Sequence, residues 1–389
     1  MKKNIIALAV AAAMIAPVAA MADTTLYGKF HVSYDFLSGD KAANTSSGFS
    51  SNSSIIGIKG KEKINDNLSM IYQYETEFDA GTKNNSGFNN SSGGLGTQRN
   101  TFIGATGTWG TVIAGRHDSP FKIMGRTYDL FGDTVGDSRN IISGSNSRAY
   151  TDANGKTVDA SNDRNWDLRP SQVLAYATPD LMGFKAMLAY VSNWSANAPV
   201  AVSQYNTQFK AYSLSAGYSI AGFGLDAAYE QHKADILSGV PGATTSQSAY
   251  RLGANYSIAG VKVLGMYQDI KSLGFLSGAD QKTYGVGAAY TFLGANTIKA
   301  QYYKAADVSG TTGTGANMWA LGYDYALSKQ TNVYAMYAQS SNGSNATYSI
   351  MSAGTGHGGA YPENTNLNNT GSFAGGKSSA ISVGVQHKF

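Results

Sequence analysis

The sequence contains no cysteine, which excludes disulfide bonds and metal sites built from thiolates. It also carries little charge, with 14% Asp, Glu, Lys and Arg, against about a quarter in an average soluble protein. The 29 Lys and Arg residues nearly balance the 25 Asp and Glu residues. A nucleic-acid-binding protein concentrates basic residues on one face, so this balance argues against nucleic acid as a partner.

Long hydrophobic runs are missing as well. After residue 22, no apolar run approaches the roughly 18 residues that a membrane-spanning helix requires. Glycine and tyrosine are abundant instead, with 46 and 25 residues, whereas there are only 7 prolines. A chain rich in glycine and aromatic residues fits a membrane β-barrel, which distributes its apolar side chains along alternating strands.

The first 22 residues have the pattern of a secretory signal peptide. Lys2 and Lys3 provide a basic start, residues 5–18 form an apolar core, and Ala20 and Ala22 frame a small-residue cleavage site. The alternative is an N-terminal transmembrane helix, which the short apolar core disfavours. We therefore expect an exported chain whose signal peptide, residues 1–22, is cleaved, and whose residues 23–389 form one domain.

Strict alternation of apolar and polar residues begins at once in the mature chain. Between residues 24 and 37, Leu26 and Phe30 share one face, and Lys29 and His31 share the other. Such a run is long for a soluble strand but fits a tilted membrane strand. Similar segments recur at residues 53–61, 68–79, 98–106, 109–117, 169–178, 182–193, 207–220, 222–233, 246–259, 261–271, 281–292, 296–306, 315–327, 331–340 and 378–389. The sequence thus predicts an all-β fold, a transmembrane antiparallel β-barrel of about sixteen strands.

The connections between these segments alternate in length. Short turns lie at residues 179–180, 221–222, 259–260, 293–294 and 328–330. Long polar loops lie at residues 38–52, 80–97, 234–245 and 341–377. This alternation is typical of an outer-membrane barrel, which has short periplasmic turns and long extracellular loops. Aromatic residues near the strand ends would form the two girdles at the membrane interfaces.

A sheet that spans hydrocarbon has to close, because every backbone N–H and C=O must be paired internally. At about sixteen strands the interior is too wide for side chains to fill, and an aqueous channel remains. We therefore expect polar inward positions. On this interpretation Phe30, Val32 and Ile56 face lipid, whereas Ser33 and Gly57 face water and should tolerate arginine.

One connection, residues 118–169, is far longer than the usual few residues, and such segments are commonly functional. It carries three aspartates among four arginines: Asp129, Asp133, Asp137, Arg126, Arg139, Arg148 and Arg164. These carboxylates could be a catalytic pair, ordinary solvated loop charges, or one side of a transverse field inside a pore. We interpret the segment as a loop folded into the barrel lumen.

Several motifs resemble those of the Gram-negative general diffusion porins. They are LYGKF at residues 26–30, IGIKGKEKINDNLSMIYQYETEF at 56–78, RNTFIGATGTWGTVIAGR at 99–116, DLFGD at 129–133, VLAYATPDLMGFKAMLAYV at 173–191 and the final ISVGVQHKF at 381–389. The resemblance implies a homotrimeric, sixteen-stranded barrel in the lipid and lipopolysaccharide of the outer membrane. It also implies a third loop that narrows the pore, and passive diffusion of ions and small hydrophilic solutes.

The resemblance further implies that basic residues of the wall face acidic residues of the third loop across the constriction. The basic positions are Lys29, Lys59, Arg99 and Arg169. The acidic positions are Asp129, Asp133 and Asp137. Ile55 departs from the family, because many relatives carry a basic residue there. Phe389 matches the C-terminal aromatic residue that the barrel assembly machinery reads.

Catalytic chemistry has little support in the sequence. The five histidines show no metal-ligand spacing, and no nucleophile elbow or phosphate-binding loop is present, so no cofactor, metal or catalytic residue is expected. Three functions remain: a general porin of mild anion preference, a channel specific for a sugar or an anion, and a barrel enzyme such as a lipase or protease. The enzyme is disfavoured because a plausible nucleophile, base and orienting residue are missing.

Overall fold

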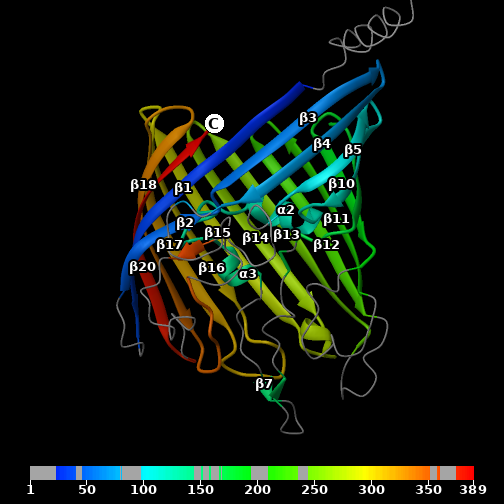
Figure 1. Ribbon diagram of the computed structural model, residues 1–389. Helices are drawn as coiled ribbons and strands as arrows, with labels where there is room; N and C mark the ends of the chain where they lie inside the picture. The colour runs from blue at the N-terminus through cyan, green and yellow to red at the C-terminus, as the bar shows by residue number, and fades with distance from the viewer. Residues whose placement is uncertain are drawn as a thin grey trace, which may run out of the picture.

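The computed structural model describes residues 23–40, 46–78, 80, 98–143, 150–151, 157–158, 166–167, 169–193, 209–234, 244–350, 357–359 and 374–389. The expected signal peptide, Arg148 and Arg164 lie outside these residues. Strands wind around a closed barrel, and the chain ends beside its first strand (Figure 1). Within the described part of the chain, no helix is long and apolar enough to cross a membrane.

The predicted barrel is confirmed. Its strands are β1 (Asp23–Gly39), β2 (Ser46–Asn52), β3 (Ile55–Asn65), β4 (Leu68–Glu77), β5 (Thr101–Gly107), β6 (Gly110–Arg116), β9 (Val173–Ala177), β10 (Phe184–Val191), β11 (Phe209–Ile220), β12 (Phe223–Ala234), β13 (Ser246–Ile258), β14 (Val261–Lys271), β15 (Gln281–Phe292), β16 (Asn296–Ala305), β17 (Ala316–Ala326), β18 (Thr331–Asn342), β19 (His357–Gly359) and β20 (Lys377–Lys388). β2 and β3 pair with successive parts of β1 and act as one interrupted strand. With that pair counted once and the three-residue β19 left out, the eighteen-stranded sheet is a barrel of sixteen.

With β2 and β3 taken as one strand and β19 left out, each strand pairs antiparallel with the next, and β20 closes the barrel by pairing with β1 and β18. Two short turns show why the chain can reverse so tightly. Ala221 and Gly222 have φ of 49° and 84°, and Ala259 and Gly260 have φ of 49° and 83°. Two successive residues with positive φ are typical of the type I′ hairpin, whose twist matches that of the flanking strands.

The outward face of the barrel is apolar, as the alternation predicted. On β13, Leu252 is 50% exposed, whereas its neighbour Arg251 is 0% exposed and points inward. Leu214 on β11 and Val286 on β15 continue the exposed apolar band. In a water-soluble protein such a band would be unfavourable, but it matches the hydrocarbon that surrounds a membrane barrel.

The inward face differs from the expectation of uniformly polar, water-facing positions. An apolar patch on β6, β9 and β10 consists of Ile113, Val173, Ala175, Ala189 and Val191. The inward wall of β1 and β3 is also crowded. A Cβ at Gly57 would lie 2.7 Å from the Tyr27 ring, and Ser33 is 2% exposed and accepts a hydrogen bond from Asn52 at 2.8 Å. The expectation that Ser33 and Gly57 face water was therefore wrong, because neighbouring side chains fill these sites; their tolerance of arginine stays a prediction.

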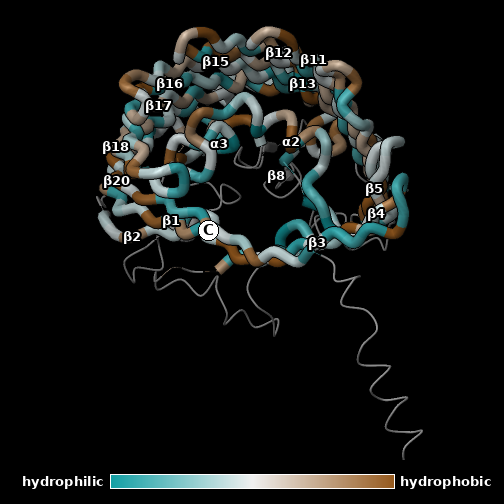
Figure 2. The backbone as a smooth tube through the Cα atoms, turned by 90° about the horizontal axis from the view of Figure 1, so that it is seen from above, coloured by the Kyte–Doolittle hydropathy of each residue, from teal (hydrophilic) through white to brown (hydrophobic). Residues whose placement is uncertain are grey.

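The long connection contains α2 (Pro120–Thr127), α3 (Arg139–Ile142) and a small hairpin of β7 (Tyr150–Thr151) and β8 (Thr157–Val158). Its two helices lie inside the barrel, whereas β7 lies beyond the ends of the barrel strands (Figure 1). Figure 2, viewed along the barrel, places α2 and α3 within the ring of strands. α2 contacts β10 to β13, and α3 contacts β16 and β17. We call residues 118–143 the inner loop.

Candidate functional site

The inner loop begins with a helix that packs on the wall. The hydroxyl of Ser119 accepts a hydrogen bond from the backbone N–H of Lys122 at 3.2 Å and so caps α2. Pro120 occupies the first turn, where its missing N–H leaves no helical bond unmade. Phe121 and Met124 are buried beside β11 to β13. The helix is therefore fixed at its start and along one apolar face.

The buried guanidinium of Arg251 anchors this helix to β13. It donates hydrogen bonds to the backbone oxygens of Phe121 and Trp166 at 2.9 and 3.3 Å. It also donates to the side chain of Gln268 at 2.5 Å and lies 3.9 Å from the centroid of the Phe121 ring. Phe121 lies near the start of the long connection, and Trp166 lies near its end. One wall residue, Arg251, therefore fixes both ends of this connection.

The middle of the inner loop is tied to β12 and β16. The Tyr128 hydroxyl donates to Asp226 at 2.7 Å. Gln301 accepts from the backbone N–H of Leu130 at 2.9 Å and donates to the backbone oxygen of Gly136 at 2.7 Å. These bonds hold the backbone of the inner loop against the far wall, opposite β1 to β4.

At its tip, the inner loop carries a compact charge cluster. Asp133 contacts Lys29 of β1 at 2.9 Å and both Arg126 and Arg139 at 3.0 Å. Asp137 contacts Arg126 at 3.1 Å and Arg139 at 2.7 Å. The loop's own arginines thus neutralise most of its acidic charge. Among the ion pairs of the described residues, Lys29 is the wall residue whose side chain reaches this cluster.

The same charges determine the ionisation of Asp133. Burial acts to raise the pKa of this carboxyl, but the charges of Arg126, Lys29 and Arg139 hold the pKa well below its usual range. Asp133 therefore stays ionised at neutral pH and keeps the loop tip attached to β1.

Asp129 has a different environment. It accepts hydrogen bonds from the backbone N–H groups of Phe131 and Ser138 at 2.8 and 3.0 Å, and from Gln301 at 3.1 Å. These donors favour its charged form, yet burial and the nearby charge of Asp137 outweigh them and raise the pKa of Asp129 to about 7. Asp129 shapes the loop backbone and can change charge near neutral pH.

The wall next to Lys29 carries its own ion pairs. Arg99 donates to Glu75 at 2.7 Å and to Glu77 at 3.0 Å. The Tyr27 hydroxyl donates to Glu75 at 2.9 Å, and the Lys59 ammonium lies 5.1 Å from the centroid of the Tyr27 ring. Among the described residues, exposed Lys59 enters no ion pair. Lys59 is therefore the least compensated cation of this wall.

Arg169 lies apart from the charge cluster, at the base of the inner loop. It contacts Asp118 at 2.8 Å and donates to Asn100 at 3.1 Å. Asp118 also binds Lys122 at 3.1 Å. Burial acts to raise the pKa of Asp118, but Lys122 and Arg169 together hold it below its usual range. This group fixes the point where the loop leaves the wall.

The structure thus brings Lys29, Asp133 and Asp137 together, and it places Lys59 and Arg99 on the adjoining wall. Glu75 and Glu77, which are central to this wall, were missed in the sequence. They could have been found, because both occupy the inward face of an alternating strand. Ile55 also points inward, since it pairs with Lys29.

The C-terminal residue Phe389 lies on the outward face. Its backbone N–H and C=O exchange hydrogen bonds with Gly28 at 3.1 and 3.0 Å. Its ring centroid lies 6.1 Å from that of Phe30. The last residue is therefore ordered against β1 and exposes an aromatic ring beside the membrane-facing band.

Over the residues that the structure describes, no group of three or more His, Cys, Asp or Glu side chains is arranged to hold a metal ion. The paired carboxylates and guanidinium groups of the inner loop instead present fixed charge to water. Such an arrangement can sort solutes by size and charge as they pass.

Comparison with known proteins agrees with this geometry. A family model described as Gram-negative porin matches residues 7–345. Outer membrane porin protein 32 of Delftia acidovorans is 28% identical over 407 residues and covers 100% of both chains. Two solved structures share the fold. The anion-selective porin from Comamonas acidovorans has a TM-score of 0.69 at 19% identity, covering 95% of this chain and 100% of its own. The trimer form of OmpT from Vibrio cholerae has a TM-score of 0.59 at 14% identity, covering 95% and 99%.

Proposed function

The chain belongs to the Gram-negative porin family, and from that premise we propose that the inner loop forms the constriction of its channel. The protein is an outer-membrane porin, a water-filled channel through which ions and small hydrophilic solutes diffuse passively. The contact between Lys29 and Asp133 carries the proposal about the constriction, because it joins the wall of β1 to the loop tip. The matched relatives are channels, and we assign this chain no catalytic activity.

The open part of the constriction lies between the inner loop and the wall of β3 to β6. Support comes from the anchoring of the loop, since α2 packs on β10 to β13 and α3 on β16 and β17. On the side of β3 to β5, the inward charges include those of Lys59, Arg99, Glu75 and Glu77. A solute would therefore pass between this wall and the charge cluster of the loop.

The exposed position of Lys59 favours a mild preference for anions. Arg99 is compensated by two carboxylates and Lys29 by Asp133, whereas Lys59 is exposed to the lumen. An uncompensated cation in a narrow wet passage raises the local concentration of anions. The porin of Comamonas acidovorans is described as anion-selective, which is consistent with this preference.

Because the chain has no cysteine, single cysteines can test where the loop lies. We choose Gly132→Cys, since a Cβ there meets Arg126 at an ordinary distance of 3.4 Å. Attaching a bulky anionic thiol reagent should reduce single-channel conductance in planar bilayers. The matched control is Asp66→Cys in an exposed turn, where modification should leave the current unchanged. An unchanged current after complete modification of Gly132→Cys would place the loop outside the passage.

The same bilayer measurements separate the functional alternatives. A general porin gives large, ohmic conductance steps that do not saturate with salt. A channel specific for a sugar or an anion gives steps that its solute blocks. A barrel enzyme gives negligible steps, and that result would remove the channel function itself.

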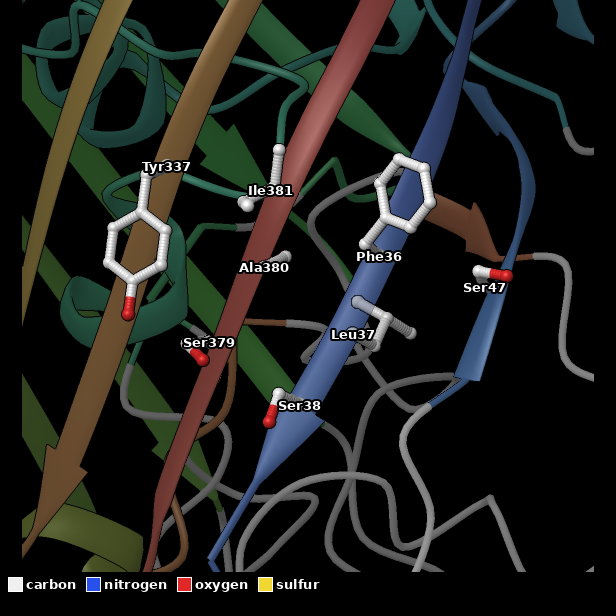
Figure 3. Close-up of a pocket in the computed structure, with 8 residues that line it drawn as sticks. All are labelled: Phe36, Leu37, Ser38, Ser47, Tyr337, Ser379, Ala380 and Ile381. Atoms are coloured by element: carbon white, nitrogen blue, oxygen red, sulfur yellow. The ribbon is translucent and has the colours of Figure 1, made fainter.

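We further propose that the chain forms a homotrimer through the outward face of β18, β20 and β1. Tyr337, Ile381 and Phe36 are neighbours in register across these three strands. Figure 3 shows them around a hollow of about 360 Å³, which Ser47 also lines. An aromatic, hollowed surface suits close packing against a second copy. The trimer form of OmpT from Vibrio cholerae lends support by fold.

The subunit contact can be tested with a matched pair of variants. Ser47→Arg adds a large charged side chain at the rim of the hollow, whereas Ser246→Arg adds the same side chain on β13. The first should give monomers and the second trimers in unheated detergent electrophoresis and light scattering. Trimers of Ser47→Arg would exclude this contact surface.

Phe389 is our candidate for recognition by the barrel assembly machinery. Its ring is exposed at the end of the last strand, so a partner can reach it before the barrel closes. Phe389→Ala should lower the amount of folded protein in the outer membrane, whereas Phe389→Tyr should retain it. Equal amounts of both variants would oppose this role.

A further inference from the structure

A row of three side chains crosses the lumen wall on β3, β4 and β5, which are neighbouring strands (Figure 1). Lys59 of β3 lies directly opposite Gln73 of β4, and Gln73 lies directly opposite Phe102 of β5. The adjacent pair Tyr72 and Ile103 faces outward, with Ile103 58% exposed, so the row faces the lumen. Neighbouring strands are about 4.8 Å apart, and directly opposite side chains can reach one another. The row thus presents a cation, an amide and an aromatic ring side by side.

The Phe102 ring is held in a fixed place on this wall. It is half-buried and packs against the apolar patch of β6, β9 and β10. The His117 ring meets it edge-on, with the two ring centroids 5.3 Å apart and an interplanar angle of 64°. His117 is itself fixed, because its Nδ1 donates a hydrogen bond to the backbone oxygen of Asp118 at 2.8 Å. A solute can therefore pack on the exposed part of the Phe102 ring without rearranging the wall.

Glycines border the Phe102 ring on two sides. Gly115 of β6 lies directly opposite Phe102, and Gly104 follows two residues later on the same face of β5. A Cβ at Gly115 would lie 2.8 Å from the Phe102 Cα and 3.1 Å from its Cβ, so only glycine fits there. No side chain extends from these two positions toward a solute at the ring.

Lys59 supplies the charge of the row. Its side chain is exposed, and among the described residues it enters no ion pair. Glu75 lies two residues beyond Gln73 on the same face of β4. One oxygen of Glu75 accepts from Arg99 at 2.7 Å, and the other accepts from the Tyr27 hydroxyl at 2.9 Å. An anion beside Lys59 therefore meets a carboxylate whose charge is already compensated.

We propose that Lys59, Gln73 and Phe102 form a subsite for aromatic monocarboxylates, with the solute's ring packed on Phe102 and its carboxylate beside Lys59. The amide of Gln73 lies between them and carries N–H donors for the same carboxylate. Aromatic rings favour stacked or edge-to-face contact, and a few polar groups on an apolar wall fix the orientation of a ligand. The inference rests on the proposed function, because solutes have to pass between this wall and the inner loop. It narrows a mild preference for anions to anions that carry a ring.

The test uses single channels of the full-length protein in planar bilayers, in potassium chloride at neutral pH and constant ionic strength. Benzoate is the probe, acetate has the carboxylate without the ring, and benzyl alcohol has the ring without the charge. A solute held briefly in the passage interrupts the chloride current, so its half-blocking concentration measures its binding. An aromatic contact contributes about two- to tenfold in affinity. We expect benzoate to block at concentrations at least about threefold below those of acetate and benzyl alcohol.

Conservative variants separate the ring of Phe102 from its bulk. Phe102→Leu keeps an apolar side chain and should raise the half-blocking concentration of benzoate about two- to tenfold, whereas Phe102→Tyr keeps the ring and should retain the native value. Lys59→Gln should raise the same concentration about two- to fivefold. Phe223→Leu is the matched control, because it removes a ring that is 40% exposed on the outward face of β12; benzoate should block it as it blocks the native channel.

Several outcomes would overturn the subsite. Benzoate that blocks the native channel no better than acetate or benzyl alcohol would show that ring and charge do not act together. Native block in Phe102→Leu, equal weakening in Phe102→Leu and Phe102→Tyr, or equal weakening in Phe223→Leu would each show that the Phe102 ring is not the contact. The conductance steps in chloride alone report on the channel separately. Absent steps in the native protein reject the channel function, whereas normal steps with one of these outcomes reject only the aromatic subsite.

Discussion

Replacing Lys59 by glutamine should lower the anion preference of the channel. Lys59 is exposed on the inward face of β3, and its ammonium lies 5.1 Å from the centroid of the Tyr27 ring. The Arg99 side chain is only 16% exposed and binds two carboxylates. A passing ion therefore experiences the charge of Lys59 with little local cancellation.

The size of the effect follows from Coulomb's law. A unit charge about 4 Å from an ion interacts by ~1 kcal/mol in bulk water and ~4 kcal/mol at an effective dielectric of about 20. A hydrated passage is nearer the first value, and 1 kcal/mol changes a population about fivefold. Screening at physiological salt, with a Debye length of about 8 Å, weakens this somewhat. We expect the chloride-to-potassium permeability ratio to fall by about two- to fivefold.

The measurement is the reversal potential of single channels in planar bilayers under a potassium chloride gradient. Lys63→Gln is the matched control, because Lys63 is 69% exposed at a short turn and pairs with Asp66 at 2.6 Å. Lys59→Arg should keep the native potential. Near 1 M salt, where the Debye length is about 3 Å, the difference should largely vanish. An unchanged potential in Lys59→Gln, or an equal shift in Lys63→Gln, would refute the reasoning.

Three further predictions concern the loop and the wall. Because the raised pKa of Asp129 is about 7, lowering the pH from 8 to 6 should protonate it and raise anion preference; reversal potentials of Asp129→Asn should lack this dependence. Arg251→Met removes the anchor of α2 and leaves its buried partners unpaired, which costs about 3–5 kcal/mol; current recordings should show frequent closures, and native-like traces would contradict the anchor. Leu252→Arg places a charge near the membrane midplane at a cost of about 2–4 kcal/mol, so folded yield in lipid vesicles should fall, whereas Leu327→Arg beyond the end of β17 should fold normally.

The strands were predictable because one physical rule governs them. Alternation with a period of two placed strands at residues 261–271 and 281–292, and β14 and β15 occupy these ranges. β9 is shorter than the predicted 169–178 and covers Val173–Ala177. Pro170 lacks an N–H for the ladder, and Arg169 turns toward Asp118. The contact between Arg169 and Asp118 at the base of the inner loop thus makes β9 shorter than the alternating pattern of residues 169–178 predicts.

The charges of the inner loop were harder to predict. Its length and its acidic residues indicated a segment inside the lumen, yet their partners depend on a turn. Asp133 has a φ of 57°, a conformation that aspartate tolerates better than most residues. This turn allows Arg126 and Arg139 to meet on one carboxylate. Arg126 lies seven residues before Asp133, and Arg139 lies six residues after it. No helix or strand spacing brings such positions together, so these contacts could not be predicted from the sequence.

The anchoring of the inner loop has a consequence for selectivity. On β11 to β17 the loop is held by buried groups such as Phe121, Arg251 and Gln301, whereas at β1 the tip is held by the ion pair of Lys29. The loop's arginines already satisfy its carboxylates, so a fully acidic loop does not face a fully basic wall. The paired charges largely cancel, so the net electric field across the passage is small. Lys59, which enters no ion pair among the described residues, can then determine whether this field favours anions or cations. Selectivity in such a channel should respond strongly to single wall charges and remain modest in size.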